Sequence, residues 1–178
     1  MIFEEKKISS QRIYEGAILN VRRDKVTAYG GEAYREIIEH NGAVAMVPIT
    51  EEGNIIMVEQ FRYACGRAVL EIPAGKIDAG ETDPAAVAAR ELREETGYTA
   101  DNIILLGKIN TSAAYSEEMI SVYAMTGLTP GEQQLDDDEA LNVIEMPFKE
   151  AYDMAASGKL IDAKTIAALL MAKEQLGL

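Results

Sequence analysis

The chain has 178 residues, 48% of them hydrophobic, and carries 30 acidic against 17 basic side chains, for a formal charge of -13. This composition is enough for one compact domain with a real core, or for a domain with a short appended element. The negative charge argues against nucleic acid or an anionic membrane surface as a partner, and a small anionic substrate would require local cations.

The opening residues and the cysteine content limit where in the cell the protein is expected. The stretch MIFEEKKISS lacks the apolar core of a signal peptide, and no apolar run is long enough to cross a bilayer. The single cysteine, Cys65, cannot form an internal disulfide. The only histidine, His40, is remote in the sequence, so we expect Cys65 to be a small buried side chain and not a nucleophile. We therefore expect a cytoplasmic protein with no membrane partner.

The N-terminal part of the chain is predicted to be rich in strands. The segments KVTAY (25–29) and EAYREII (32–38) show strand-type alternation around a two-glycine turn, which favours a hairpin. We expect this strand-rich segment to occupy residues 1–40 and to precede a main domain at residues 41–178.

Three apolar segments follow. AVAMVPI (43–49) and IIMVEQF (55–61) flank the turn TEEGN, and we expect them to form a second antiparallel pair that is largely buried. VLEI (69–72) is predicted to be a short strand that ends at Pro73. These strands lead into a glycine-punctuated loop, PAGKIDAGE.

The helix predicted after this loop has clear signals at both ends. Asp83 is placed to cap its N-terminus, Pro84 occupies a position that needs no N–H, and Gly97 lies where helices commonly end in left-handed geometry. Later strands are predicted at IILLGKI, MISVYAM and LNVIEM, and later helices at FKEAYDMAAS and DAKTIAALLMAKEQL, the second capped by Asp162. Strands mixed with a few helices, without regular alternation, indicate an α+β fold.

The first predicted helix carries a cluster of acidic side chains. At about 100° per residue, Glu91, Glu94 and Glu95 share one stripe, which Arg90 flanks, and apolar residues fill the neighbouring stripe. Like charges at this spacing repel one another, so the stripe is either a solvated surface or a site for cations. The glycine-rich loop favours a site, because backbone carbonyls and Glu81 could face the same stripe, and hard oxygen ligands suit Mg²⁺ or Mn²⁺.

The segment from Gly75 to Tyr98 resembles the Nudix box, Gly-x5-Glu-x7-Arg-Glu-U-x-Glu-Glu-x-Gly-U, in which U is apolar. The matching residues are, in order, Gly75, Glu81, Arg90, Glu91, Leu92, Glu94, Glu95, Gly97 and Tyr98. One departure lies between Glu81 and Arg90, where eight residues, TDPAAVAA, stand instead of seven. The role of Glu81 is therefore less defined than the roles of the helical acids.

This resemblance implies a Nudix αβα sandwich with a mixed sheet, and hydrolysis of a nucleoside diphosphate linked to another moiety. It implies Glu91, Glu95 and the backbone oxygen of Ala74 as ligands of a divalent metal. Glu94 would bind the metal directly or through water, and Arg90 would hold the acids in place. The metal would neutralise the diphosphate and lower the pKa of a bound water, whose proton a carboxylate would take.

Beyond the box, three segments resemble the ADP-ribose pyrophosphatase branch of this family: YREIIEHNGAVAMVPI, VEQFRYACGRAVLEIPAGK and SGKLIDAKTIAALLMA. The branch implies a homodimer in which the strand-rich N-terminal segment is exchanged between subunits. It implies contacts of Arg35 and Glu36 with adenosine bound by the other subunit, although a solvated strand face is the alternative for both residues. It also implies Arg62 as a phosphate or ribose contact and, less directly, Glu71 as a further substrate contact.

The catalytic base in this branch can come from a late acidic loop. Here that loop is LDDDEA, which makes Glu139 the first candidate and Asp138 the second, although a run of acids is usually only solvated. Glu94 is a rival for this role. The Ser-Pro-Gly stretch common in the branch is absent, and Ala113 and Ala114 stand in place of proline and glycine.

We therefore predict a Mg²⁺-dependent hydrolase, with Mn²⁺ as an alternative metal, that converts ADP-ribose or a related ADP-sugar to AMP and ribose 5-phosphate. Another nucleoside diphosphate sugar, such as GDP-mannose or UDP-glucose, is the alternative substrate. A non-hydrolytic module that senses nucleotides is the alternative class of protein. No nucleic-acid partner is expected, because the basic residues do not cluster.

Overall fold

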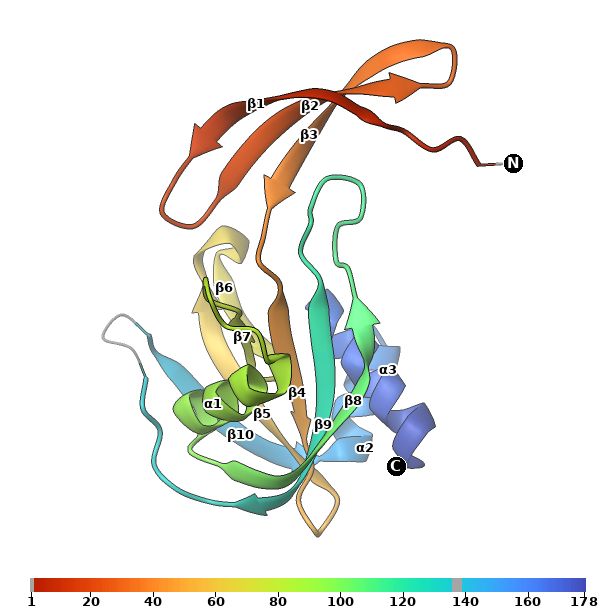
Figure 1. The fold of residues 1–178 in the computed structure, drawn as a ribbon. Helices are drawn as coiled ribbons and strands as arrows, with labels where there is room; N and C mark the ends of the chain where they lie inside the picture. The colour runs from red at the N-terminus through yellow and green to blue at the C-terminus, as the bar shows by residue number, and fades with distance from the viewer. Residues whose placement is uncertain (1, 136–138) are drawn as a thin grey trace. The chain divides into compact units, whose positions relative to one another are not determined.

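The computed structural model describes residues 2–135 and 139–178, shown as a ribbon in Figure 1. The chain divides into two compact units. Unit 1 comprises Met1–Gly42 and Asn110–Met119, and unit 2 comprises Ala43–Ile109 and Ile120–Leu178. In the described ranges, no helix combines the length and the apolar character that crossing a membrane would require.

Unit 1 is a three-stranded antiparallel sheet. Its strands, in spatial order, are β1 (Lys7–Glu15), β2 (Asn20–Ala28) and β3 (Gly31–Glu39). Ala28 pairs with Gly31, so the turn consists of Tyr29 and Gly30, and the φ of 90° at position 30 suits glycine. The predicted hairpin between β2 and β3 is therefore confirmed.

The loop Asn110–Met119 belongs to unit 1 because it bonds to β3. The backbone N–H of Ile38 donates to the carbonyl of Tyr115 at 2.7 Å, and the N–H of Glu117 donates to the carbonyl of Ile38 at 3.0 Å. Arg22 on β2 also donates to the Glu117 carboxylate, at 2.9 Å from Nη1. Residues distant in sequence thus complete the N-terminal sheet.

Unit 2 contains two sheets. The four-stranded sheet consists, in spatial order, of β7 (Ala74–Lys76), β4 (Ala43–Pro48), β9 (Ile120–Thr129) and β8 (Thr99–Ile109). The three-stranded sheet consists of β10 (Leu141–Pro147), β5 (Asn54–Arg62) and β6 (Arg67–Glu71). Because β4 and β9 run parallel and the other pairs are antiparallel, the four-stranded sheet is mixed, as predicted.

The expected antiparallel pair of β4 and β5 is wrong. The turn between them is present and Ile49 bridges Ile55, but beyond that point the two strands belong to different sheets. β4 pairs with β7 and β9, whereas β5 pairs with β10 and β6. β4 is buried at every position, as expected for an inner strand that finds a neighbour on each side.

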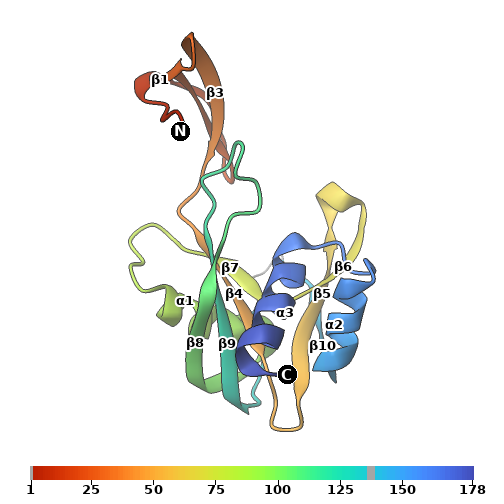
Figure 2. The same ribbon diagram turned by 90° about the vertical axis from the view of Figure 1, so that its right-hand side faces the viewer.

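Side chains of β4 alternate between two cores. Ala45 and Val47 pack in a cluster with residues of α2 (Phe148–Ala156) and α3 (Ala163–Leu176), whereas Val44 and Met46 pack with residues of α1 (Pro84–Thr96). This alternation follows from the two-residue period of a strand. Figure 2 shows α1 on one side of β4 and α3 on the other, so the predicted layering of helices on both faces is confirmed.

Local signals placed the helix ends correctly. Asp83 Oδ1 accepts a hydrogen bond from the Ala85 N–H at 3.0 Å, and Gly97 ends α1 with a φ of 79°. Asp162 Oδ2 caps α3 by accepting from the Thr165 N–H at 2.9 Å. The expected burial of Cys65 is wrong, because this residue is exposed in a short 3₁₀ helix (Tyr63–Cys65) that has no buried residue.

Candidate active site

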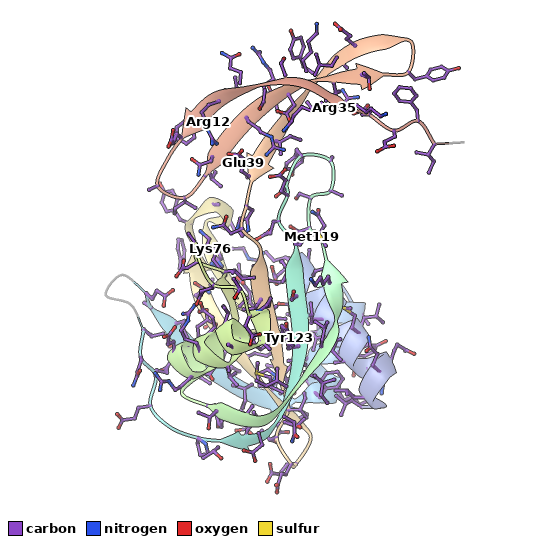
Figure 3. The ribbon with its side chains drawn as sticks, viewed as in Figure 1. Arg12, Arg35, Glu39, Lys76, Met119 and Tyr123 are labelled. Carbon is purple, nitrogen blue, oxygen red and sulfur yellow. The ribbon has the colours of Figure 1, made fainter. Side chains whose placement is uncertain are left out.

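A polar cleft of about 390 Å³ opens in unit 2 beside α1 and β7. Its lining residues come from β5, from β7 and the loop after it, from α1, and from the late loop before β10: Gln60, Arg62, Ala74, Gly75, Lys76, Asp78, Arg90, Glu91, Glu94, Glu95, Gln134 and Glu139. Figure 3 labels Lys76 among these side chains. Charged and amide groups dominate the lining, so the cleft suits a charged, polar ligand.

Glu95 fixes α1 against β7 from a buried position that favours its protonated form. Its side chain is 6% exposed, and its Oε2 accepts a hydrogen bond from the Ala74 N–H at 3.1 Å. The pKa of Glu95 is raised to about 8, mainly by burial and less by the nearby Glu91 and Glu139, while the Ala74 hydrogen bond acts in the opposite direction. A cation in the cleft would favour the ionised form.

Glu91 lies directly against the backbone of Gly75. A Cβ added at position 75 would stand 2.0 Å from Glu91 Cδ, so no other residue fits without moving this carboxylate. Burial raises the pKa of Glu91, and the attraction of Arg90 only partly offsets this effect. Position 75, the first of the sequence motif, is thus a glycine because α1 packs the carboxylate of Glu91 against it.

Arg90 contacts three acids at the edge of the cleft. Its Nη1 lies 2.7 Å from Glu94 Oε2, and its Nη2 lies 3.0 Å from Glu91 Oε1 and 3.3 Å from Glu81 Oε1. Burial lowers the pKa of Arg90, but these carboxylates raise it by more, so the guanidinium stays charged. The other oxygen of Glu81 accepts from the Asp78 N–H at 2.8 Å, which turns Glu81 toward its own loop and Arg90.

Arg62 forms a bidentate ion pair with the buried carboxylate of Glu71. Its Nε and Nη2 each donate to Glu71 at 2.7 Å. Glu71 is 2% exposed and also binds Lys164, a residue that was not among the candidates from the sequence. Burial raises the pKa of Glu71, but hydrogen bonds and attraction from Arg62 and Lys164 lower it by more, to a net value below the ordinary one.

The late acidic loop is fastened to the last turn of α1. The side-chain amide of Gln133 donates to the carbonyl of Glu95 at 2.6 Å, and the N–H of Gln134 donates to the carbonyl of Glu94 at 2.9 Å. Glu139, which follows in the same loop, also lines the cleft. Asp138, the second candidate base, lies outside the described residues. Gln133 and Gln134 were missed because polar loop residues carry no periodic signal.

Two further candidates belong to unit 1. Arg35 and Glu36 lie on β3, opposite Asp24 and Arg23 of β2. The Arg35 guanidinium forms an ion pair with Glu5, and its Nε donates to Glu5 at 2.9 Å. Arg35 is labelled in Figure 3, together with Arg12 and Glu39, which form another ion pair of this unit.

The donor set of the cleft fits a hard divalent cation. Among the residues that the structure describes, no three His, Cys, Asp or Glu side chains stand close enough to hold a metal ion as they are placed. Glu91, Glu95 and the backbone of Ala74 nevertheless supply oxygen donors to one cleft. Both carboxylates have raised pKa values because they are buried, and a bound cation would compensate for that burial.

Comparison with known proteins gives matches to a family model, to whole-chain relatives and to a solved structure. The model of the NUDIX domain matches residues 39–169. The chain is 39% identical over 171 residues to a methanol dehydrogenase activator of Bacillus methanolicus, covering 94% of this chain and 92% of that protein. It is 40% identical over 178 residues to an ADP-ribose pyrophosphatase of Bacillus subtilis, covering 97% of this chain and 96% of that protein. A crystal structure of an ADP compounds hydrolase shares the fold, with a TM-score of 0.87, 22% identity and coverage of 99% of this chain and 96% of that one.

Proposed function

The chain belongs to the Nudix family of hydrolases, and from that premise we propose that it cleaves the diphosphate bond of ADP-ribose to give AMP and ribose 5-phosphate. The observation that carries this proposal is the cleft in which Glu91, Glu94 and Glu95 stand together with Arg90. Similarity to an ADP-ribose pyrophosphatase over nearly the full length of both chains supports the choice of substrate.

The proposed cofactor is Mg²⁺, with Mn²⁺ as a substitute. Glu91, Glu95 and the backbone oxygen of Ala74 would hold it, and Glu94 would bind it directly or through water. When bound, the ion supplies charge neutralisation for the diphosphate and lowers the pKa of a water. Arg90 contributes by holding Glu91 and Glu94 in place through its hydrogen bond and ion pair.

Arg62 is the proposed contact to the diphosphate. Its Nε and Nη2 each bond to Glu71, which leaves Nη1 and one proton of Nη2 for substrate oxygens in the cleft. Because Glu71 is 2% exposed, we propose that it acts on the substrate through Arg62 and not by direct contact. For the base that takes the proton of the attacking water, Glu139 is our first choice and Glu94 the second.

We also propose that unit 1 forms a homodimer, with Arg35 and Glu36 reaching the adenosine of the other subunit. Every residue of β1 is exposed. Large apolar side chains of unit 1 are about half exposed or more: Ile8, Ile13, Tyr14, Leu19 and Tyr34. Light scattering of the purified protein should give twice the chain mass, and the mass of a single chain would contradict this proposal.

The function is tested by the products of a substrate panel. Purified protein with Mg²⁺ should release AMP and ribose 5-phosphate from ADP-ribose, measured by ion-exchange chromatography, and GDP-mannose and UDP-glucose should be cleaved more slowly. Cleavage of another nucleotide sugar but not of ADP-ribose would overturn the substrate. Binding without cleavage of any member would indicate a nucleotide-sensing module.

A second candidate function comes from the relative named methanol dehydrogenase activator. If this second function applies, the protein raises the rate of a dehydrogenase to which it is added. Adding wild-type protein or Glu95→Gln protein to an alcohol dehydrogenase assay separates the cases. Activation by wild type alone would tie the effect to hydrolysis, activation by both would make it independent of hydrolysis, and activation by neither would exclude it for that dehydrogenase.

A further inference from the structure

The guanidinium of Arg62, which lines the cleft, pairs with Glu71 of β6, and Glu71 in turn pairs with Lys164 of α3. We propose that Lys164 is a positioning residue, which acts through Glu71 to hold Arg62 with its remaining donors toward the diphosphate of the substrate. The inference rests on the proposed function, because it assumes that Arg62 contacts the diphosphate.

The contacts form a line of alternating charge. Glu71 receives Arg62 on one side, at 2.7 Å from both Nε and Nη2, and the Lys164 ammonium on the other. Lys164 lies in turn 3.1 Å from Asp162 Oδ2. The Glu71 and Lys164 side chains are 3% and 12% exposed, whereas that of Arg62 is 42% exposed. The Glu71–Lys164 pair is therefore buried, and Arg62 is the member of this row that reaches solvent.

Two cations, Arg62 and Lys164, stabilise the ionised form of the buried Glu71 carboxylate. A carboxylate removed from water is costly unless it is paired and hydrogen-bonded, and Arg62 alone would have to balance that cost. With Lys164 present, Glu71 binds the fork of Arg62 with both oxygens, which fixes the plane of the guanidinium. Nη1 is bonded to no other residue in the part of the chain that the structure describes, so it remains available for an anion.

The place of Lys164 in α3 supports a role beyond helix stability. Lys164 is the second residue of α3, where the helix dipole disfavours a positive charge. The same first turn also holds the backbone next to Glu71, because Thr165 Oγ1 accepts from the Ile72 N–H at 2.9 Å and donates to Asp162 Oδ2 at 2.6 Å. The first turn of α3 thus binds the Glu71 side chain through Lys164 and the main chain that leads to Ala74 through Thr165.

Loss of the Lys164 charge should weaken substrate binding more than it slows chemistry. In Lys164→Met, Glu71 has one cation instead of two, and the cluster of Arg62, Glu71, Lys164 and Asp162 changes from neutral to a charge of -1. We expect the KM for ADP-ribose to rise about tenfold while kcat changes less than about twofold. Lys164→Arg keeps the charge and should stay within about twofold of wild type in both constants.

A binding measurement separates this role from any effect on the metal. The Kd of ADP-ribose is measured by calorimetry in EDTA, and Lys164→Met should raise it about tenfold. Lys149→Met is the matched control, since it removes one positive charge from the exposed face of α2, where Lys149 pairs only with Asp153 among the described residues, and it should leave Kd unchanged. If Lys164→Met does not fold, Lys164→Gln, which keeps a donor but not the charge, is measured with the same expectation.

A double-mutant cycle tests the route through Arg62. In the Arg62→Met background, Lys164→Met should add little further loss of affinity, because the group that it positions is gone. Fully additive losses, or an unchanged Kd in Lys164→Met while wild type binds and cleaves ADP-ribose, would overturn this inference alone. A wild-type protein that neither binds nor cleaves ADP-ribose would instead overturn the proposed function, and this inference with it.

Discussion

The carboxylate of Glu91 occupies the space beside Gly75 that a side chain would fill, since a Cβ at position 75 would lie 2.0 Å from Glu91 Cδ and 2.3 Å from its Oε1. We therefore expect Gly75→Ala to displace Glu91 and to lower kcat about a hundredfold or more, because a misplaced ligand removes the geometry that the reaction needs. AMP release at saturating ADP-ribose and Mg²⁺ measures this loss.

Gly158→Ala is a control for the general cost of adding a methyl group. Gly158 has a φ of +74°, and a Cβ added there would meet nothing within 4 Å, so alanine introduces only local backbone strain of about 1 kcal/mol. This variant should lose a few degrees of Tm and keep its activity. If Gly75→Ala also kept wild-type kcat, Glu91 would not need its observed position.

Glu95→Gln should separate catalysis from folding. The neutral amide resembles the protonated form that burial favours, so the Tm in EDTA should change little near neutral pH. We expect kcat to fall at least about a hundredfold, and we expect the rise in Tm that Mg²⁺ gives to wild type to disappear. Scanning fluorimetry with EDTA or Mg²⁺ and an AMP assay give both readouts.

Glu150→Gln, which removes an exposed acid from α2, serves as the charge control for this variant. It should keep both the activity and the Mg²⁺-dependent rise in Tm. A Glu95→Gln protein that still gained stability from Mg²⁺ would remove Glu95 from the proposed metal ligands.

The identity of the base can be decided by comparing Glu139→Gln with Glu94→Gln. If Glu139 takes the proton of water, its loss should lower kcat by about 10²- to 10³-fold and leave the Mg²⁺ concentration for half-maximal rate unchanged. Glu94 bonds to Arg90 at 2.7 Å beside Glu91, so its loss should raise that Mg²⁺ concentration. The reverse pattern in the two variants would assign the base to Glu94.

The buried ion pairs of Glu71 should appear in acid stability. The pKa of Glu71 is lower in the folded protein than its ordinary value of 4.5, so its contribution to the free energy of unfolding is present above that value and is lost as the pH falls through the folded pKa. Glu71→Gln should cost about 3 to 5 kcal/mol at neutral pH, because it leaves Arg62 and Lys164 without their carboxylate.

Urea unfolding of wild type and Glu71→Gln across the acid range measures this difference. The difference in the free energy of unfolding between the two proteins should become smaller as the pH drops below the ordinary pKa of a glutamate. A gap that stayed constant down to strongly acid pH would show that Glu71 is not ionised in the folded protein.

Local signals in the sequence were sufficient for α1 and for the acids that share one stripe of it. The N-cap Asp83 and the terminal Gly97 act within a turn of the residues that they cap, so one stretch of sequence contains both partners. The partners of β4 and β5 were not predictable in this way. Both strands are apolar and adjacent in the chain, and only the three-dimensional arrangement shows that they enter different sheets.

Long-range contacts explain what was missed in the cleft. Lys164 and Glu71 are separated by 93 positions, and Gln133 and Glu95 by 38, so no sequence window contains both partners. The exposure of Cys65 was missed because burial was inferred from residue type, whereas the turn between β5 and β6 determines it.

The discontinuity of unit 1 has a consequence for biosynthesis. Ile38 finds two of its backbone hydrogen-bond partners, Tyr115 and Glu117, in the segment Asn110–Met119, which follows β4 to β8 in the chain. During translation this edge of β3 therefore stays unpaired until the first part of the other unit, Ala43–Ile109, has been made. A shortened chain that begins at Ala43 would leave this segment without its partner strand, so trimming at the apparent boundary should expose new backbone instead of freeing an intact catalytic unit.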